Sequence, residues 1–400
     1  MGWMDLMTVS FSFARVPPIH CGTGMLKEIT AWLCSLKAQS VLLVTGKASL
    51  QEKGQLSVVA SLIADAAAKH DHVVCAGEPS TELVDRTTQQ FFGYGIDAVI
   101  GIGGGSVIDF GKAIAAMIPN GNSVLDHLEG VGRGLAHSGI TLPFLAIPTT
   151  SGTGGEVSKN AVLSHVGPDG YKKSLRHDNF VPSAVILDGL LLTGAAADVT
   201  AACGMDAFTQ LLEPFLSPTA SPLSDAIVWS GLQHLVPNLR RACGEGSADP
   251  QVRLNMAYGA LCSGVGLANA GLGIVHGLAG PIGGWFPMPH GVICGTLMAA
   301  AQQQNWSALK QRDPHNPAVE RMARVGRLMP DGSNLTQNTA AVDHLTDCLG
   351  QWVDELKIPR LSDYGITHGD LDRIVGAASN RNNPVALTPS EIKTLLETRL

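Results

Sequence analysis

The chain has 400 residues, of which 45% are hydrophobic, 15% are charged and 46 are glycine. This hydrophobic fraction excludes a disordered chain, and a formal net charge of −7 provides no basic surface for a nucleic-acid backbone. We therefore expect a globular protein of two domains that does not bind nucleic acid.

The first half of the chain alternates between short apolar runs and helical patterns. The apolar runs are rich in β-branched residues, which is typical of buried parallel strands. Segments 56–69 and 81–93 have helical patterns, so the order is the βαβα alternation of a doubly wound sheet. The predicted strands are 41–45, 73–75, 97–102, 143–147 and 184–187.

From about Thr193 onward the strand signal fades and helical patterns follow one another. We therefore predict an α/β domain at 1–193 and an all-α domain at 194–400, with a cleft between them. No low-complexity linker or internal repeat marks the boundary. The predicted helices are 203–216, 221–240, 250–270, 276–284, 291–303, 317–328, 336–355 and 369–378.

A first candidate ligand site is the sequence DAVIGIGGGSVIDFGK at 97–112. The predicted strand ends at Ile102, glycines follow, and Ser106 opens a helix that contains Asp109. Glycines at this point let the backbone approach a diphosphate, and free N–H groups at a helix start attract it. A strand-to-helix turn without a ligand has the same composition, and the usual GxGxxG fingerprint after the first strand is absent.

A second polar loop, PTTSGTGGEVSKN at 148–160, also follows a predicted strand. Its hydroxyls and bare amides suit the ribose, phosphate and amide edges of a nucleotide, although a surface turn has a similar composition. Two such loops after two strands favour one ligand in the crevice at the carboxyl ends of the strands.

A third candidate site combines 203–217 with 271–296. Asp206 and Gln210 are four residues apart, on one face of a predicted helix. His276 and His290 are joined by a turn rich in glycine and proline that could bring both imidazoles together. One carboxylate, one amide and two imidazoles suit Fe(II) or Zn(II), although Gln is an uncommon ligand and separated histidines are often structural.

Together these blocks resemble the iron-containing, group III alcohol dehydrogenases of the dehydroquinate synthase-like superfamily. The resemblance runs nearly the whole length, through GGGSVID (103–109), PTTSGTGGE (148–156), ILD (186–188), GMDAFTQ (204–210) and PHG (289–291). Several motifs in the same order and spacing are more specific than any one of them.

The resemblance implies a Rossmann-like N-terminal domain that binds NAD or NADP and an all-α C-terminal domain that binds a divalent metal and carries the catalytic residues. Asp206, His276 and His290 match three of the family's four metal ligands, and Gln210 stands at the fourth position. The implied cofactor-binding residues are Gly46, Gly103, Gly104, Gly105, Ser106, Asp109, Thr149, Thr150, Thr153 and Lys172.

Three residues depart from the family pattern. Gln210 stands where the family usually has His, and its amide oxygen is expected to bind Fe²⁺ or Zn²⁺ less tightly than an imidazole, which lowers the expected metal occupancy. Gly280 stands where many members have a His that relays a proton. In this chain the proton relay would have to be water, the ribose hydroxyls of the cofactor or a group such as His137 or His165. Pro214 follows Gln210 by one turn and is expected to kink the helix.

The choice between NAD and NADP also stays open. Many members that prefer NAD have an Asp after the first strand, which repels a 2′-phosphate. This chain has Gly46 there, followed by Lys47 and Ser49. Gly46 in place of Asp permits NADP. Lys47 either attracts the 2′-phosphate of NADP or is a solvated surface lysine.

We expect a metal-dependent NAD(P)-linked alcohol dehydrogenase that transfers a hydride between a small alcohol and nicotinamide. A metal-independent reductase of the maleylacetate reductase type is the alternative within the oxidoreductases. A non-catalytic nucleotide-binding relic is a third interpretation, and a lyase of the dehydroquinate synthase type is the least favoured.

The remaining expectations concern location and assembly. No stretch reaches about 18 apolar residues, and the N-terminus lacks a basic leader before an apolar core, so we expect a cytoplasmic protein that does not span a membrane. The eight cysteines are predicted to be reduced and mostly buried. Family members commonly form homodimers or larger homo-oligomers, and we expect the same here.

Overall fold

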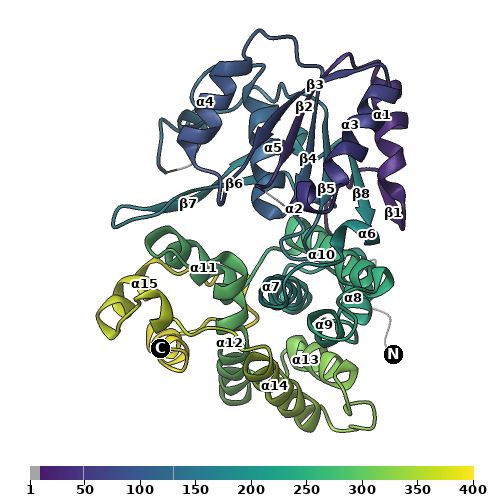
Figure 1. Cartoon of the computed structure of the whole chain (residues 1–400). Helices are drawn as coiled ribbons and strands as arrows, with labels where there is room; N and C mark the ends of the chain where they lie inside the picture. Colours follow the sequence, from purple (N-terminus) through teal and green to yellow (C-terminus); the bar gives the residue numbers. More distant parts are fainter. Residues whose placement is uncertain (1–9, 48, 129) are drawn as a thin grey trace.

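The computed structural model describes residues 10–47, 49–128 and 130–400. Its upper half is a layered α/β unit and its lower half is a group of helices (Figure 1). These two halves have the order that the sequence predicts, α/β first and all-α second. The boundary placed between residues 193 and 194 stays a prediction.

The α/β half is built on a parallel sheet of six strands in the order β1-β8-β5-β4-β2-β3. A separate antiparallel hairpin, β6–β7, extends to one side beneath α4 (Figure 1). The strands are β1 (Ile19–Gly22), β2 (Ser40–Thr45), β3 (Lys69–Val74), β4 (Ala98–Gly103), β5 (Phe144–Pro148), β6 (Asn160–His165), β7 (Tyr171–Arg176) and β8 (Ala184–Asp188).

Alternate side chains of the central strands enter two different cores. Leu42 and Val44 of β2 pack with α4 and α5, whereas Val41 and Leu43 pack with α1 and α3. Helices therefore cover both faces of the sheet, which explains why the sequences of these strands are continuous apolar runs. The helices of this half are α1 (Glu28–Leu36), α2 (Ser49–Glu52), α3 (Gln55–Asp65), α4 (Thr81–Phe91), α5 (Gly105–Met117) and α6 (Gly189–Leu192).

The second half packs around one large core that contains buried residues from 201 to 396. Helix α7 lies at its centre, and α10 lies directly beneath the sheet, where Ala257 and Leu261 join the core of the α/β half (Figure 1). The helices are α7 (Ala197–Leu216), α8 (Pro222–Leu235), α9 (Leu239–Cys243), α10 (Pro250–Ala270), α11 (Ile274–Trp285), α12 (His290–Arg312), α13 (Pro317–Leu328), α14 (Asn338–Glu355), α15 (Leu371–Ala377) and α16 (Pro389–Glu397).

Several predicted elements differ from the structure. Strand β3 begins at Lys69, earlier than predicted, because it is an edge strand whose polar side chains hide its pattern. The predicted helix 221–240 is two helices, with a break around Pro237, whose ring cannot continue the hydrogen-bond ladder. Strand β1, the hairpin β6–β7 and helices α1 and α16 were not predicted.

No single helix in the described part of the chain is long and apolar enough to cross a membrane. Helices α10 and α11 pass that test only as a pair, and they are bent by 100° relative to each other. Among the same residues all eight cysteines are free, as predicted, but Cys21 and Cys34 are exposed. The prediction that most cysteines are buried is wrong, because four are buried and Cys203 and Cys243 are only partly buried.

Candidate active site

A cavity of about 290 Å³ lies between the carboxyl ends of the sheet strands and helices α10 to α12. Its wall comes from both halves of the chain, which confirms the predicted cleft. The α/β half contributes the start of α5, the loop after β5 and the hairpin β6–β7. The lining residues that carry polar side chains or helix-start amides are Glu78, Gly105, Ser106, Asp109, Thr153, Ser158, Asn160, Ser164, Lys172, Ser174, Gln210, His276 and His290.

The start of α5 points at this cavity. Gly104 is the N-cap and offers no side-chain cap to the first amides of the helix. Its carbonyl accepts from Val107 and Ile108, so the N–H groups of Gly105 and Ser106 lie at the open end of the helix. A Cβ at Gly103 would lie 2.5 Å from the Val107 side chain, so this tight turn requires glycine. Helix-start amides beside a cavity are suited to bind a diphosphate.

The loop after β5 is held against α5 by a buried lysine. The ammonium of Lys112 donates to the carbonyls of Gly155, Ser158 and Asn160 at 2.6 to 2.8 Å. Burial lowers the pKa of Lys112 to about 8 and raises the pKa of Glu156, beside it, to about 7. Three carbonyls on one ammonium fix the path of the loop, so Thr153 is held at the cavity wall.

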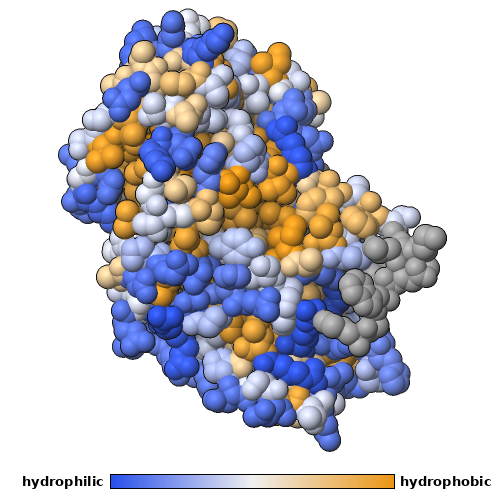
Figure 2. Space-filling model, turned by 90° about the vertical axis from the view of Figure 1, so that its right-hand side faces the viewer, coloured by the Kyte–Doolittle hydropathy of each residue, from blue (hydrophilic) through white to orange (hydrophobic). Residues whose placement is uncertain are grey.

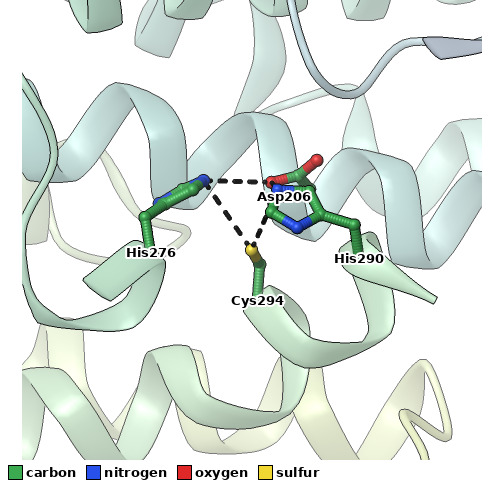
Figure 3. A group of neighbouring side chains, drawn as sticks. All are labelled: Asp206, His276, His290 and Cys294. Carbon is green, nitrogen blue, oxygen red and sulfur yellow. Dashed lines mark hydrogen bonds and ion pairs between the residues drawn. The ribbon is translucent and has the colours of Figure 1, made fainter. Parts of the chain in front are cut away.

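Four side chains converge at the floor of the cavity (Figure 3). The Nε2 atom of His276 lies 3.4 Å from Oδ1 of Asp206, and Nε2 of His290 lies 3.8 Å from the same oxygen. The Sγ atom of Cys294 lies 3.7 Å from Nε2 of His276 and 3.8 Å from Nε2 of His290. All four ligand atoms lie within 4.8 Å of one another, a spacing compatible with one metal ion.

Asp206 has an unsatisfied oxygen at the centre of this group. Its Oδ1 atom is buried and has no hydrogen-bond partner among the described residues. Burial alone would raise the pKa of Asp206, but the neighbouring imidazoles of His290 and His276 lower it overall. Burial alone would lower the pKa of the neighbouring His276, but Cys294, Asp206 and Glu213 raise it well above its usual value, so this buried group favours a positive charge beside Asp206. The residues present therefore fit a divalent metal.

Glu213 orients the imidazole of His276. Nδ1 of His276 donates to Oε2 of Glu213 at 2.7 Å, and Oε1 of Glu213 accepts from the Val275 N–H at 2.7 Å. This contact leaves Nε2 free to face Asp206. Burial lowers the pKa of His290 to about 4, so its ring is neutral at neutral pH, which is the form that binds a metal.

Gln210 faces the cavity but has its amide committed elsewhere. Its NH₂ group donates to the carbonyl of Thr153 at 2.7 Å and to the hydroxyl of Ser263 at 2.9 Å. Because the Thr153 carbonyl only accepts hydrogen bonds, the amide nitrogen of Gln210 faces Thr153 and the amide oxygen faces away from it. Gln210 thus connects α7 to the loop after β5. Its assignment as a metal ligand stays a prediction.

Gly280 leaves space at the cavity wall. A Cβ built there has no heavy atom within 4 Å among the described residues. Neither histidine considered as a substitute lies at this place: His137 packs against His127 and Phe180, and His165 stacks on Tyr171. The helix α7 continues for two residues beyond Pro214, so this proline falls in its last turn. Whether it kinks the helix stays a prediction.

The predicted cofactor residues fall into two groups. Gly105, Ser106, Asp109, Thr153 and Lys172 line the same cavity as the two imidazoles. The others lie at the strand ends: Gly46 follows β2, Gly103 ends β4, Gly104 caps α5, and Thr149 and Thr150 line a small pocket with Cys203 and Arg253. Lys47 is exposed, and the side chain of Ser49 lies outside the described residues.

Sequence reasoning missed Glu78, Ser164, Glu213 and Cys294. Two of them carried a signal, because Cys294 follows His290 by four residues, and Glu213 lies on the α7 face that also carries Asp206. Glu78 accepts from Lys172 at 2.7 Å and from Ser164 at 2.7 Å. Nothing in the sequence places this pair at the cavity, because it joins the loop before α4 to the unpredicted hairpin.

Comparisons with known proteins place both halves of the chain in one family. Residues 17–189 match the family model described as iron-containing alcohol dehydrogenase, and residues 200–400 match the C-terminal model of the same family. The chain is 30% identical over 396 residues to long-chain-alcohol dehydrogenase 1 of Geobacillus thermodenitrificans, with 96% of both chains covered.

Two solved structures have the same fold. One is a 1,3-propanediol oxidoreductase, with a TM-score of 0.85, 26% identity, and 98% of this chain and 100% of that chain covered. The other is a sulfoacetaldehyde reductase from Bifidobacterium kashiwanohense in complex with NAD⁺, with a TM-score of 0.82, 23% identity, and coverage of 98% and 99%.

Proposed function

The chain belongs to the iron-containing alcohol dehydrogenase family, and from that premise we propose that its cavity catalyses hydride transfer between a small alcohol and a nicotinamide cofactor. The family uses NAD(P) and a divalent metal, and its members are oxidoreductases. The observation that carries the proposal is that helix-start amides and two imidazoles line one cavity.

The proposed cofactor path follows the first wall of the cavity. The amides of Gly105 and Ser106 at the start of α5 attract the diphosphate, and Thr149 and Thr150 lie toward the adenosine end. Thr153 lies against the start of α5, since a Cβ on Gly105 would be 3.0 Å from its side chain, and Lys172 lies on the side of His290, where the nicotinamide would be placed. The space beside Gly46 accepts either NAD or NADP, since a Cβ added there would have its nearest neighbour 3.9 Å away.

The proposed metal residues are Asp206, His276 and His290, with Gln210 as the fourth expected from the resemblance. A bound divalent metal supplies Lewis-acid stabilisation of an alkoxide or of an aldehyde oxygen. The chain's own contribution is orientation: Glu213 holds His276, and the neutral ring of His290 presents Nε2 to the same point. These fixed groups reduce the reorganisation needed when charge develops on the substrate oxygen.

A proton route is proposed through Lys172. Its ammonium is held by both oxygens of Glu78, at 2.7 and 2.8 Å. A Cβ built on Gly283, one turn after Gly280, would lie 3.9 Å from Nζ of Lys172. Lys172 and Gly280 line the same cavity, and we assign to Lys172 the proton exchange with the alcohol oxygen.

The proposed substrate class is a small alcohol or aldehyde. The names of the relatives range from long-chain alcohols to 1,3-propanediol and sulfoacetaldehyde, so a substrate panel has to cover alcohols of different length and charge. We also propose a homodimer or larger homo-oligomer in the cytoplasm. Apolar residues gather on one face near the junction of the two halves, which supports self-association (Figure 2). Light scattering and cell fractionation test these two points.

The test of the activity uses a panel of alcohols and aldehydes with NAD(H) and NADP(H), followed by the absorbance of the reduced nicotinamide. We expect turnover that is lost on chelation and returns with Fe(II) or Zn(II). Full activity in metal-free protein would instead support a metal-independent reductase. Absence of turnover with every pair, after metal is restored, would reject the proposal and favour a non-catalytic nucleotide-binding protein.

A further inference from the structure

Cys294 lies in the group of ligand atoms beneath the cavity. It follows His290 by four residues on α12, so one turn of the helix carries both side chains on the same face. Its thiol is fully buried and points at the space between His276 and His290 (Figure 3).

The distances in this group match the edges of a metal tetrahedron. Bonds of the usual length to Zn(II) give edges of about 3.4 Å between nitrogen and oxygen ligands and about 3.6 Å between sulfur and nitrogen. The corresponding distances are 3.4 and 3.8 Å from Asp206 to the imidazoles, and 3.7 and 3.8 Å from Cys294 to the imidazoles. The two remaining pairs of ligand atoms, between the imidazoles and between Asp206 and Cys294, also lie within 4.8 Å, so all four atoms surround one position.

Gln210, which occupies the family's fourth ligand position, is poorly suited to that role. Its NH₂ group is fixed by the Thr153 carbonyl and the Ser263 hydroxyl, so the amide oxygen is the only atom that it can offer to a metal. A neutral amide oxygen is also a weaker ligand for Zn(II) than a thiolate.

We infer that Cys294, in place of Gln210, is the fourth protein ligand of the metal in this chain. This inference rests on the proposed function and deepens it, because it specifies the metal site of that dehydrogenase. On binding, the thiol releases its proton to solvent and sulfur supplies both electrons of the new bond. A set of one thiolate, two imidazoles and one carboxylate favours Zn(II).

The position of Cys294 leaves the substrate side open. Asp206 and Cys294 are buried below the cavity wall, whereas His276 and His290 form part of that wall. A substrate oxygen therefore approaches a metal held by these four residues from the cavity. A fifth ligand can be accepted there, as in zinc enzymes that expand their coordination.

The test replaces the metal with Co(II) in the full chain and records its absorption. Thiolate coordination gives an intense sulfur-to-cobalt band in the near ultraviolet, and we expect this band in the wild-type protein and its loss in Cys294→Ser. Cys348→Ser is the matched control, because Cys348 also follows a histidine by four residues on a helix, with its Sγ 3.5 Å from Nε2 of His344. This control and Gln210→Ala should keep the band.

Competition with a zinc chelator supplies a second measurement. We expect Cys294→Ser to weaken Zn(II) binding at least about tenfold and Cys348→Ser to leave it unchanged. A wild-type protein that binds one equivalent of Co(II) without the sulfur band, or that loses the band on Gln210→Ala, would overturn the inference even if Cys294→Ser does not fold. Turnover without the sulfur band would reject Cys294 as a ligand and leave the dehydrogenase proposal intact. A sulfur band without turnover would support Cys294 as a ligand and reject the dehydrogenase proposal.

Discussion

Nδ1 of His276 lies 2.7 Å from Oε2 of Glu213, across from α11 to the last turn of α7. The same carboxylate accepts from the Val275 backbone at 2.7 Å, so it fixes both the start of α11 and the direction of the imidazole. The last turn of α7, which contains Glu213 and Pro214, therefore orients one proposed metal ligand through Glu213.

Glu213→Gln is expected to weaken metal binding by about 10- to 100-fold, because the amide can accept from only one of the two donors and carries no charge. Titration against a competing chelator measures this change. Glu355→Gln, which removes a carboxylate from an exposed pair with Arg240, is the control and should bind metal normally. Equal affinity in both variants would contradict an orienting role for Glu213.

Gln210→Leu is expected to lower the free energy of unfolding by about 1 to 3 kcal/mol, since it removes the donor to the Thr153 carbonyl and the Ser263 hydroxyl inside the protein. The KM for the cofactor should rise because Thr153 loses its anchor. Urea unfolding and initial rates measure the two effects. An unchanged unfolding midpoint would show that this bond does not hold the loop.

Gly280→His is expected to add an acid–base group where the wall has room, raising the rate roughly tenfold and adding an ionisation to the pH profile of kcat. Gly280→Ala separates the steric effect: it should stabilise α11 by up to about 1 kcal/mol and leave the pH profile alone. A pH profile of Gly280→His that matches wild type would argue against this place as a proton route.

Lys172→Met is expected to lower kcat by about 10- to 100-fold, because it removes the ammonium beside Gly283 and leaves Glu78 without its partner. Burial would raise the pKa of Glu78, and Lys172 now lowers it, so the variant should also show a higher pKa at Glu78. The next residue on β7 supplies the control: Lys173 is exposed, and Lys173→Met should retain full kcat. Comparable losses in both variants would refute the assignment.

The buried carboxyl of Glu156 makes stability depend on pH. Its pKa is raised by burial to about 7 in the folded protein, from an ordinary value of 4.5, so the folded state holds the proton more tightly than the unfolded state. Stability from this group is therefore present below about pH 4.5 and is lost as the pH rises toward 7. Glu156→Gln should become more stable relative to wild type across this window, as measured by chemical unfolding at several pH values. A difference in the free energy of unfolding between variant and wild type that stays the same at every pH would contradict the raised pKa of Glu156.

Local patterns were sufficient for much of the fold. The central strands are apolar on both faces because helices cover both, so β2, β4, β5 and β8 were predicted within a residue or two. The edge strand β3 and the hairpin β6–β7 were harder, since their exposed positions are polar and their pairing depends on segments distant in sequence.

The sequence by itself determined the α/β and helical halves and the glycine-rich start of α5, and its resemblance to a known family implied the grouping of Asp206, His276 and His290. Those features follow from local periodicity and short motifs. Only the tertiary structure decided that the amide of Gln210 binds Thr153, that Glu213 holds His276 and that Cys294 lies among the imidazoles. Each of these depends on how α7, α11 and α12 pack, and packing sets distances that spacing along the chain does not specify.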